Sequence, residues 1–324
     1  MTAWGILATG WIAEMFVADL NLAGHDVVAV GSRSQASADE FAARFGIPNA
    51  HASYEALVAD PAVDIVYVAT PHPYHLANAA LALNAGKHVL IEKPITLNAV
   101  QAQELADLAE SKGLLLLEAM WTRFLPHMVR IREIIAAGTL GEVRTLIADH
   151  TQDLPDDPGH RINDLALGGG ALLDLGIYPI SFSWDLFGKP GTISAQATFK
   201  PTGADAQIAT IFGYGDGRMA TTLSASDTQG PNTAVILGTE AGIVIDSVWY
   251  EPTSFRVIDA EGNVLESYQS DVAGRGMQYQ AQEAERVLAA GEIASPLLPP
   301  AESVAIMATL DEIRAQIGLV YPRE

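Results

Sequence analysis

"HVLIEKP", residues 88–94, is the stretch from which the fold can be inferred. It begins as an apolar run typical of a buried strand, but it ends on an acid, a base and a proline, which cannot continue a strand ladder. Similar apolar runs alternate with helical patterns along the first part of the chain, at 4–8, 26–32, 63–70 and 113–120. This alternation predicts a Rossmann-type parallel sheet covered by helices on both faces. Glu92 and Lys93 should then lie at the carboxyl edge of a central strand, where such sheets bind ligands.

The pattern changes after Trp121. Helices are expected at about 126–137, 170–187, 277–290 and 300–317. Segments of strand character lie among them, at 142–150, 192–200, 206–214, 218–225, 232–238, 242–248, 254–259 and 263–268. Turns such as "YGDGR" and "DAEGN" separate several of these strands, which favours an α+β domain with a large open, mostly antiparallel sheet. We therefore expect an α/β dinucleotide-binding domain over residues 1–120 and an α+β substrate and oligomerisation domain over 121–324.

The composition restricts the partners of the protein. Of 324 residues, 49% are hydrophobic and 18% are charged, enough apolar material for a sizeable core. Lys and Arg number 18 against 39 Asp and Glu, a net charge of −21, which would repel nucleic acids and anionic membranes. The absence of cysteine excludes disulfides and thiolate chemistry, and the acid-interrupted N-terminus disfavours a signal peptide, so we expect a cytoplasmic protein. Any anion must be bound by a local site.

"GILATGWIA", residues 5–13, lies where the first strand turns into the first helix. Small residues at such a turn let backbone N–H groups and the helix dipole approach a phosphate. Ala8, Gly10 and Ala13 occupy the positions of the usual G-x-G-x-x-G pattern. The expected cofactor-binding residues of this turn are Ala8, Thr9, Gly10, Trp11 and Ile12.

The second strand ends in "VGSRSQ". NAD-binding folds commonly place a carboxylate at this point to accept the ribose 2′-hydroxyl. Here Ser32, Arg33 and Ser34 stand instead, and they suit a 2′-phosphate. A charge-assisted arginine contact contributes roughly 1.5–3 kcal/mol, so the expected cofactor is NADP, with NAD as the alternative.

A third segment, "ATPHPYH" at residues 69–75, follows another strand and should pass beneath the cofactor. Thr70, Pro71 and His75 are its expected cofactor contacts, together with Glu92 and Lys93. The pair His72 and His75 resembles a zinc pattern, but the sequence offers no third ligand nearby and no cysteine, so no metal site is expected.

"GKHVLIEKP", placed after the Ala/Gly turn, resembles the Gfo/Idh/MocA oxidoreductase family over essentially the whole chain. "EAMWTRFLP" (118–126) and "GGGALLDLGIYPI" (168–180) are similar to its branch of dimeric dihydrodiol dehydrogenases and NADP-dependent D-xylose 1-dehydrogenases. The resemblance implies a cis Lys93–Pro94 peptide that directs the lysine into the cleft. It also implies a homodimer or a larger homo-oligomer formed through the open sheet.

The same resemblance implies a catalytic pair, Lys93 and Tyr178, with Asp174 beside it. Asp174 and Tyr178 are four residues apart, on one face of an expected helix. A free tyrosine has a pKa near 10, and an ammonium about 4 Å away at an effective dielectric near 20 is worth roughly 4 kcal/mol, about three pKa units. Such a tyrosinate could accept a hydroxyl proton during hydride transfer. Pro179 should kink the helix and help to present Tyr178.

Five further residues are candidates for substrate contact. Trp121 and Trp249 match aromatic pocket residues of the dihydrodiol branch, although either could be core. His150 stands where that branch has an aromatic residue, and it would favour a polyol over an aromatic diol. Arg123 and Arg161 are candidates for positioning the substrate, with surface salt bridges as the alternative.

The expected function is therefore an NADP-dependent oxidoreductase acting on a sugar, polyol or diol. A 1,5-anhydro-D-fructose reductase or an NAD-linked inositol or glycoside dehydrogenase is the alternative within the same architecture. Arg33 argues against NAD, and Tyr178 argues against the histidine-using inositol enzymes. A non-catalytic dinucleotide-binding sensor is the alternative from another class. It would be expected to lack Lys93 or the proton donor, and both are present.

Overall fold

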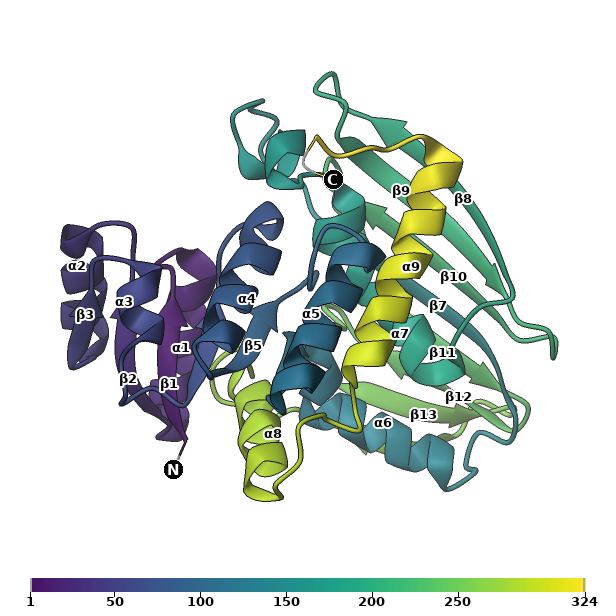
Figure 1. Ribbon diagram of the computed structural model, residues 1–324. Coiled ribbons are helices and arrows are strands. Elements are labelled where there is room, and N and C mark those ends of the chain that lie inside the picture. The colour runs from purple at the N-terminus through teal and green to yellow at the C-terminus, as the bar shows by residue number, and fades with distance from the viewer. Residues whose placement is uncertain (1, 323) are drawn as a thin grey trace. The chain divides into compact units, whose positions relative to one another are not determined.

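The computed structural model describes residues 2–322 and 324. The chain forms two compact units (Figure 1). The first comprises Met1–Trp121 and Ala273–Met307, and the second comprises Thr122–Val272 and Ala308–Glu324. The expected domain division at residue 120 stays a prediction. Residues 273–307, which that prediction placed with the second domain, lie in the first of these compact units.

The first unit is built on a six-stranded parallel sheet in the order β3-β2-β1-β4-β5-β6. Its strands are β1 (Ala3–Leu7), β2 (Asp26–Gly31), β3 (Asn49–His51), β4 (Ile65–Val68), β5 (His88–Glu92) and β6 (Leu116–Ala119). This confirms the predicted Rossmann-type sheet, and β3 is an additional strand that its three-residue sequence did not indicate. The strand order reverses between β1 and β4, so the ligand crevice of such a sheet lies at the carboxyl ends of these strands.

The helices of the first unit connect and flank the strands of this sheet. They are α1 (Trp11–Ala23), α2 (Gln35–Phe45), α3 (Tyr54–Val58), α4 (His75–Asn84), α5 (Ala99–Lys112) and α8 (Gln278–Ala289). α8 packs on α1, and the indole Nε1 of Trp4 donates to Glu285 at 2.8 Å. These contacts explain why residues 273–307 belong to this unit. The core includes Phe16, whose ring stacks on that of Tyr67 with centroids 3.9 Å apart.

The second unit contains an eight-stranded sheet in the order β14-β13-β12-β11-β7-β10-β9-β8. The strands are β7 (Val143–Thr151), β8 (Thr192–Phe199), β9 (Asp205–Gly213), β10 (Met219–Ala225), β11 (Ala234–Gly238), β12 (Ala241–Ile245), β13 (Phe255–Asp259) and β14 (Val264–Tyr268). Only the β7–β10 pair is parallel among the strands of this sheet in the described part of the chain. The predicted large, mostly antiparallel sheet is therefore confirmed.

Helix α7 (Ile177–Phe187) packs against β7 and β10 on one face of this sheet (Figure 1). The unit also holds α6 (Pro126–Ala136), while α9 (Pro300–Ile317) contributes residues to both units. A π-helical turn, Leu172–Gly176, immediately precedes α7, and the N–H of Ile177 bonds to the carbonyl of Leu172. The kink expected at Pro179 stays a prediction, and the irregularity in the hydrogen bonds is this π turn, which ends before Pro179.

The segment Leu165–Phe187 is long and apolar enough to resemble a membrane span. Within its most apolar window, however, 83% of the residues are buried inside the structure. This degree of burial is what a core helix of a folded unit shows.

Candidate active site

The turn between β1 and α1 leaves room for a ligand to come close to the backbone. Ala8 has φ of 87°, in the left-handed region where glycine is favoured, and its N–H donates to Gly31 at 3.0 Å. Gly10 precedes α1 in extended conformation, and a Cβ added there would meet no heavy atom within 4 Å. Trp11, the first residue of the helix, is 60% exposed. A phosphate could therefore reach the free N–H groups at this helix start.

Arg33 is exposed just beyond the carboxyl end of β2, while Ser32 is buried. The N–H of Ser32 donates to the carbonyl of His51 at 3.1 Å, which fixes the course of the chain at this point. Ser34 caps α2, because its hydroxyl accepts the N–H of Ser37 at 3.3 Å. Arg33 thus projects from a segment held on both sides.

His75 is fully buried and joins two of the predicted motifs. Its Nε2 lies 2.7 Å from the carbonyl oxygen of Thr70, and its Nδ1 lies 2.8 Å from that of Pro94. Burial lowers the pKa of His75 to about 4, so the ring is neutral at pH 7 and donates its single proton to one of the two carbonyls. The cofactor contact expected at His75 stays a prediction, and the two carbonyl contacts show that the ring also holds the Lys93–Pro94 segment in place.

Glu92 and Lys93 occupy the predicted carboxyl end of β5, and the Lys93–Pro94 peptide is cis, as expected. Glu92 is 4% exposed, and its carboxylate accepts the hydroxyl of Tyr67 and the N–H of Lys93. The N–H of Ile95 donates to Glu118 on the neighbouring strand at 3.0 Å. Polar partners therefore hold the chain as it leaves the sheet, and Lys93 itself is half-buried at the edge.

Tyr178, in the first turn of α7, lies within a cluster of three rings in the second unit. His150, at the end of β7, contacts it edge-on with ring centroids 4.9 Å apart. Tyr250, in the loop between β12 and β13, stacks on His150 at 3.7 Å and lies 5.5 Å from Tyr178. The sequence analysis named Tyr178 and His150 as candidates and did not name Tyr250, which contacts both rings.

Asp174 lies on the π turn that precedes Tyr178, and it is 6% exposed. The guanidinium of Arg161 donates to its carboxylate at 3.0 Å. Two predicted site residues are thereby brought together. Because the Arg161 side chain is 54% exposed, it can also reach a ligand from solvent.

Two other predicted substrate residues, Arg123 and Trp249, lie in mainly structural surroundings. Arg123 is buried and donates to the backbone and hydroxyl oxygens of Ser181 on α7, at 2.7 and 3.0 Å. Trp249 is fully buried, stacks on Phe182, and donates to the carbonyl of Asp149. Trp249 is therefore a core residue, and its neighbour Tyr250 is the aromatic side chain that lies beside Tyr178.

Trp121 is also nearly buried, at 4% exposure, and it belongs to the first unit. The guanidinium carbon of Arg275 lies 5.5 Å from the ring centroid of Trp121 and the same distance from that of Trp11. This cation–π arrangement joins Trp121 to the start of the phosphate-binding turn.

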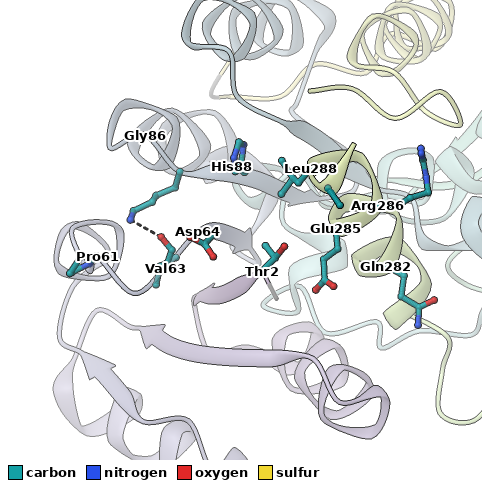
Figure 2. A pocket seen from close by; sticks show the side chains of 12 residues that line it. Thr2, Pro61, Val63, Asp64, Gly86, His88, Gln282, Glu285, Arg286 and Leu288 are labelled. Carbon is teal, nitrogen blue, oxygen red and sulfur yellow. Dashed lines mark hydrogen bonds between the residues drawn. The ribbon is translucent and has the colours of Figure 1, made fainter. Parts of the chain in front are cut away.

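A polar cleft of about 840 Å³ opens at the amino ends of β1, β4 and β5 (Figure 2). Its charged groups are engaged within the protein. Lys87 donates to the carbonyls of Asp60 and Val63, and Glu285 accepts from Trp4 and His25. The cleft lies at the edge of the sheet opposite to the motifs, so we assign it no part in the active site.

The chain matches the model of an oxidoreductase family with an NAD-binding Rossmann fold over residues 2–120. It also matches the GFO/IDH/MocA C-terminal domain over residues 128–244. It is 38% identical to trans-1,2-dihydrobenzene-1,2-diol dehydrogenase of Mus musculus, covering 99% of this chain and 98% of the relative. It is 37% identical to D-xylose 1-dehydrogenase (NADP(+)) of Hypocrea jecorina, covering 98% and 93%.

Solved structures show the same fold. An aldose-aldose oxidoreductase from Caulobacter crescentus complexed with glycerol superposes with a TM-score of 0.87 at 22% identity, covering 97% of each chain. A 3-ketoreductase from Actinomadura kijaniata in complex with NADP and TDP-benzene gives 0.83 at 25% identity, covering 98% of each chain.

Proposed function

Because the chain belongs to the Gfo/Idh/MocA oxidoreductase family, together with the dihydrodiol and D-xylose dehydrogenases that it resembles, we propose that it is an NADP-dependent sugar, polyol or diol oxidoreductase. The observation that carries the proposal is the placement of Lys93 at the carboxyl end of β5, two strands from β1 and next to the reversal of strand order. Ligands of parallel α/β sheets bind at this edge.

The residues present fit a dinucleotide. The left-handed Ala8 and the open Gly10 leave the start of α1 accessible to a pyrophosphate, and Arg33 stands beyond β2, where a 2′-phosphate would need a cation. The described segment after β2 carries no carboxylate from Ser32 to Ser37 that could take a ribose 2′-hydroxyl. These features support NADP over NAD. A bound nicotinamide would supply or accept the hydride.

The remaining chemistry is assigned to side chains of the protein. Tyr178 takes the proton of the substrate hydroxyl in oxidation and returns it to the carbonyl in reduction. The ammonium of Lys93 favours the phenolate form of Tyr178 and neutralises negative charge that develops on the substrate oxygen. Asp174, paired with Arg161, orients the substrate beside Tyr178.

The test is a near-UV absorbance assay with NADP⁺ and a panel of pentoses, hexoses and diols. Turnover is expected with at least one member of the panel. Tyr178→Phe should lower kcat about 10²- to 10⁴-fold, the usual contribution of general acid–base catalysis, and Lys93→Ala should have a similar effect. Lys112→Ala, a change at an exposed lysine that ends α5, is the matched control. Full turnover by both site variants would refute the mechanism, and inactivity of the wild-type protein with every substrate would refute the function.

We also propose that the open face of the eight-stranded sheet pairs with a second copy of the chain. Ile147, Leu223 and Ile211 on adjacent strands are 49%, 44% and 48% exposed. The register pairs Ile147 with Thr221, and Thr221 with Ile211, so these side chains share one face. An apolar patch on a sheet face is typical of an interface.

Light scattering at micromolar concentration should therefore report a dimer or a larger homo-oligomer. The double variant Ile211→Lys and Leu223→Lys should shift the protein toward monomer, because it buries two charges in the contact. Val320→Lys, at a position that is 69% exposed near the end of the chain, is the control. A wild-type protein that is monomeric under these conditions would contradict the assembly without affecting the proposed activity.

A further inference from the structure

The ring cluster around Tyr178 has a polar side that the proposed reaction does not use. His150 and Tyr250 stack face to face, with an interplanar angle of 23° and centroids 3.7 Å apart, and both rings lie within 5.5 Å of that of Tyr178. Tyr178 is 8% exposed and Tyr250 is 5% exposed, so both are mostly buried. A substrate oxygen held by the Tyr178 hydroxyl would therefore have the His150–Tyr250 stack as its neighbour.

Gln152 forms hydrogen bonds with both of the stacked rings. Its amide nitrogen lies 3.0 Å from Nε2 of His150, and its side chain also hydrogen-bonds the hydroxyl of Tyr250. An amide nitrogen can only donate, so Nε2 of His150 accepts, and a neutral imidazole then carries its proton on Nδ1. Burial raises the pKa of Tyr250 well above its usual value, so its phenol stays protonated at any physiological pH. The stack is thus uncharged, with a fixed set of donors and acceptors.

The backbone that carries Tyr250 is anchored on two sides. The hydroxyl of Thr122 donates to the carbonyl of Tyr250 at 2.7 Å. The preceding residue, Trp249, donates from its indole to the carbonyl of Asp149, the neighbour of His150, at 2.7 Å. His127 contacts the carbonyl of Trp249 at 3.0 Å. These bonds hold the loop against the end of β7, which keeps Tyr250 on His150.

We propose that Tyr250 and Gln152 are positioning residues that hold His150 as a hydroxyl-recognising wall beside Tyr178. We also propose that this wall makes the protein selective for a ring that carries hydroxyl groups on most of its atoms, such as a cyclic sugar, over a diol whose other ring atoms are apolar. The proposal rests on the proposed function of Tyr178. A substrate hydroxyl can exchange hydrogen bonds with the imidazole and the amide. An apolar ring leaves buried polar groups without a partner, which disfavours its binding.

The test compares kcat/KM for D-xylose and for trans-1,2-cyclohexanediol with NADP⁺. Tyr250→Phe keeps the stacked ring but removes the hydroxyl that holds Gln152. It should lower kcat/KM for the sugar about tenfold, mainly through KM, and leave the diol within about twofold, in line with the loss of one buried hydrogen bond. Gln152→Met should have the same effect, and the double variant should be no worse than either single variant, because both break one network.

Tyr214→Phe is the matched control, since this tyrosine packs on Phe187 away from the ring cluster and should leave both substrates unaffected. The proposal would be overturned if the ratio of kcat/KM for the sugar to kcat/KM for the diol were the same in Tyr250→Phe and Gln152→Met as in wild type. An equal loss with both substrates would also overturn it, because it would show a merely structural role. If Tyr250→Phe fails to fold, Gln152→Met decides on the same criterion. A wild-type protein that turns over neither substrate fails the proposed function instead, which is a separate outcome.

Discussion

The hydroxyl of Tyr67 donates a hydrogen bond to the carboxylate of Glu92, and this contact explains how a buried strand ends on an acid. Tyr67 is fully buried on β4, and Glu92 ends the neighbouring β5. The N–H of Lys93 supplies a second donor at 3.1 Å. The carboxylate is thus provided with protein donors in place of water, and the main chain of Lys93 is fixed by the same contact.

Tyr67→Phe should reduce the free energy of unfolding by about 1–3 kcal/mol, because it removes one donor from a buried carboxylate. The ring remains, so the stack on Phe16 is retained. Urea denaturation at pH 7 measures the change. Tyr54→Phe, at a less buried tyrosine in the same unit, should stay within about 0.5 kcal/mol of wild type. Equal stabilities of Tyr67→Phe and wild type would show that the contact contributes nothing.

His75 makes stability fall in mild acid. Burial lowers its pKa from 6.5 to about 4, so the unfolded chain binds more protons between these values. Its contribution to stability is complete above pH 6.5 and is lost as the pH falls through 4, by up to about 3 kcal/mol. His127, whose pKa burial also lowers to about 4, acts in the same direction.

The variant His75→Gln should therefore show a flatter dependence of unfolding free energy on pH between 6.5 and 4. Its absolute stability at pH 7 should be lower, because the contacts to Thr70 and Pro94 are weakened. Denaturation series at several pH values measure both effects. His160→Gln, in the loop before α7, is the control. A slope identical to that of wild type would show that His75 does not titrate as inferred.

The strands whose sequence carries a clear hydrophobic pattern could be predicted. The apolar runs that become β1, β2, β4, β5 and β6 predicted a parallel sheet, because unbroken apolar runs are typical of strands that are buried on both faces. β3 has only three residues, two of them polar, and carries no such signal. The π turn at Leu172–Gly176 was also hidden, since a shift in the hydrogen-bond ladder leaves no mark in the hydrophobic period.

The surroundings of the candidate site residues were harder to predict, because they depend on contacts between residues that are far apart in the sequence. Trp249 and Tyr250 are adjacent aromatic residues, and their sequence does not indicate which one enters the core. The long-range bond from the Trp249 indole to Asp149 decides this. His75 was likewise expected as a cofactor contact from its place after β4, and its two carbonyl partners, five and nineteen residues away, could not be read from the sequence.

Asp205 has the opposite pH dependence from His75. It is fully buried at the start of β9 and accepts the N–H of Leu172 at 2.6 Å, at the beginning of the π turn that carries Asp174. Burial raises its pKa from 3.8 to about 6, although the backbone donors and Arg314 oppose the shift. The folded state therefore favours the protonated acid. This contribution is present below pH 3.8 and is lost as the pH rises through 6, by about 3 kcal/mol.

Asp205→Asn keeps an acceptor for Leu172 but cannot ionise. Relative to wild type, its unfolding free energy should therefore increase by up to about 3 kcal/mol between pH 3.5 and pH 7. Chemical denaturation of both proteins at the two pH values gives this difference. Asp271→Asn, at an exposed position, should show little change. A difference between Asp205→Asn and wild type that does not vary with pH would mean that folding does not change the pKa of Asp205.

Arg33 should determine the preference for NADP. It is exposed beyond β2, in a segment held by the Ser32 bond to His51 and the Ser34 cap. Arg33→Ala should weaken NADP⁺ binding by about ten- to hundredfold, since a charge-assisted hydrogen bond contributes roughly 1.5–3 kcal/mol. Binding of NAD⁺, which lacks the 2′-phosphate, should change less than about twofold. Quenching of tryptophan fluorescence measures both affinities.

The control for Arg33→Ala is Arg44→Ala, because Arg44 is also an exposed arginine of the first unit but pairs with Glu14 at 2.9 Å. In this strongly acidic protein, removing any cation makes the general field slightly more repulsive to a dinucleotide. Arg44→Ala reports that general effect, which should be equal for the two dinucleotides. A specific 2′-phosphate contact predicts instead that only Arg33→Ala changes the ratio of NADP⁺ to NAD⁺ affinity. If both variants weaken both cofactors equally, Arg33 contributes only to the field, and another residue must distinguish the two dinucleotides.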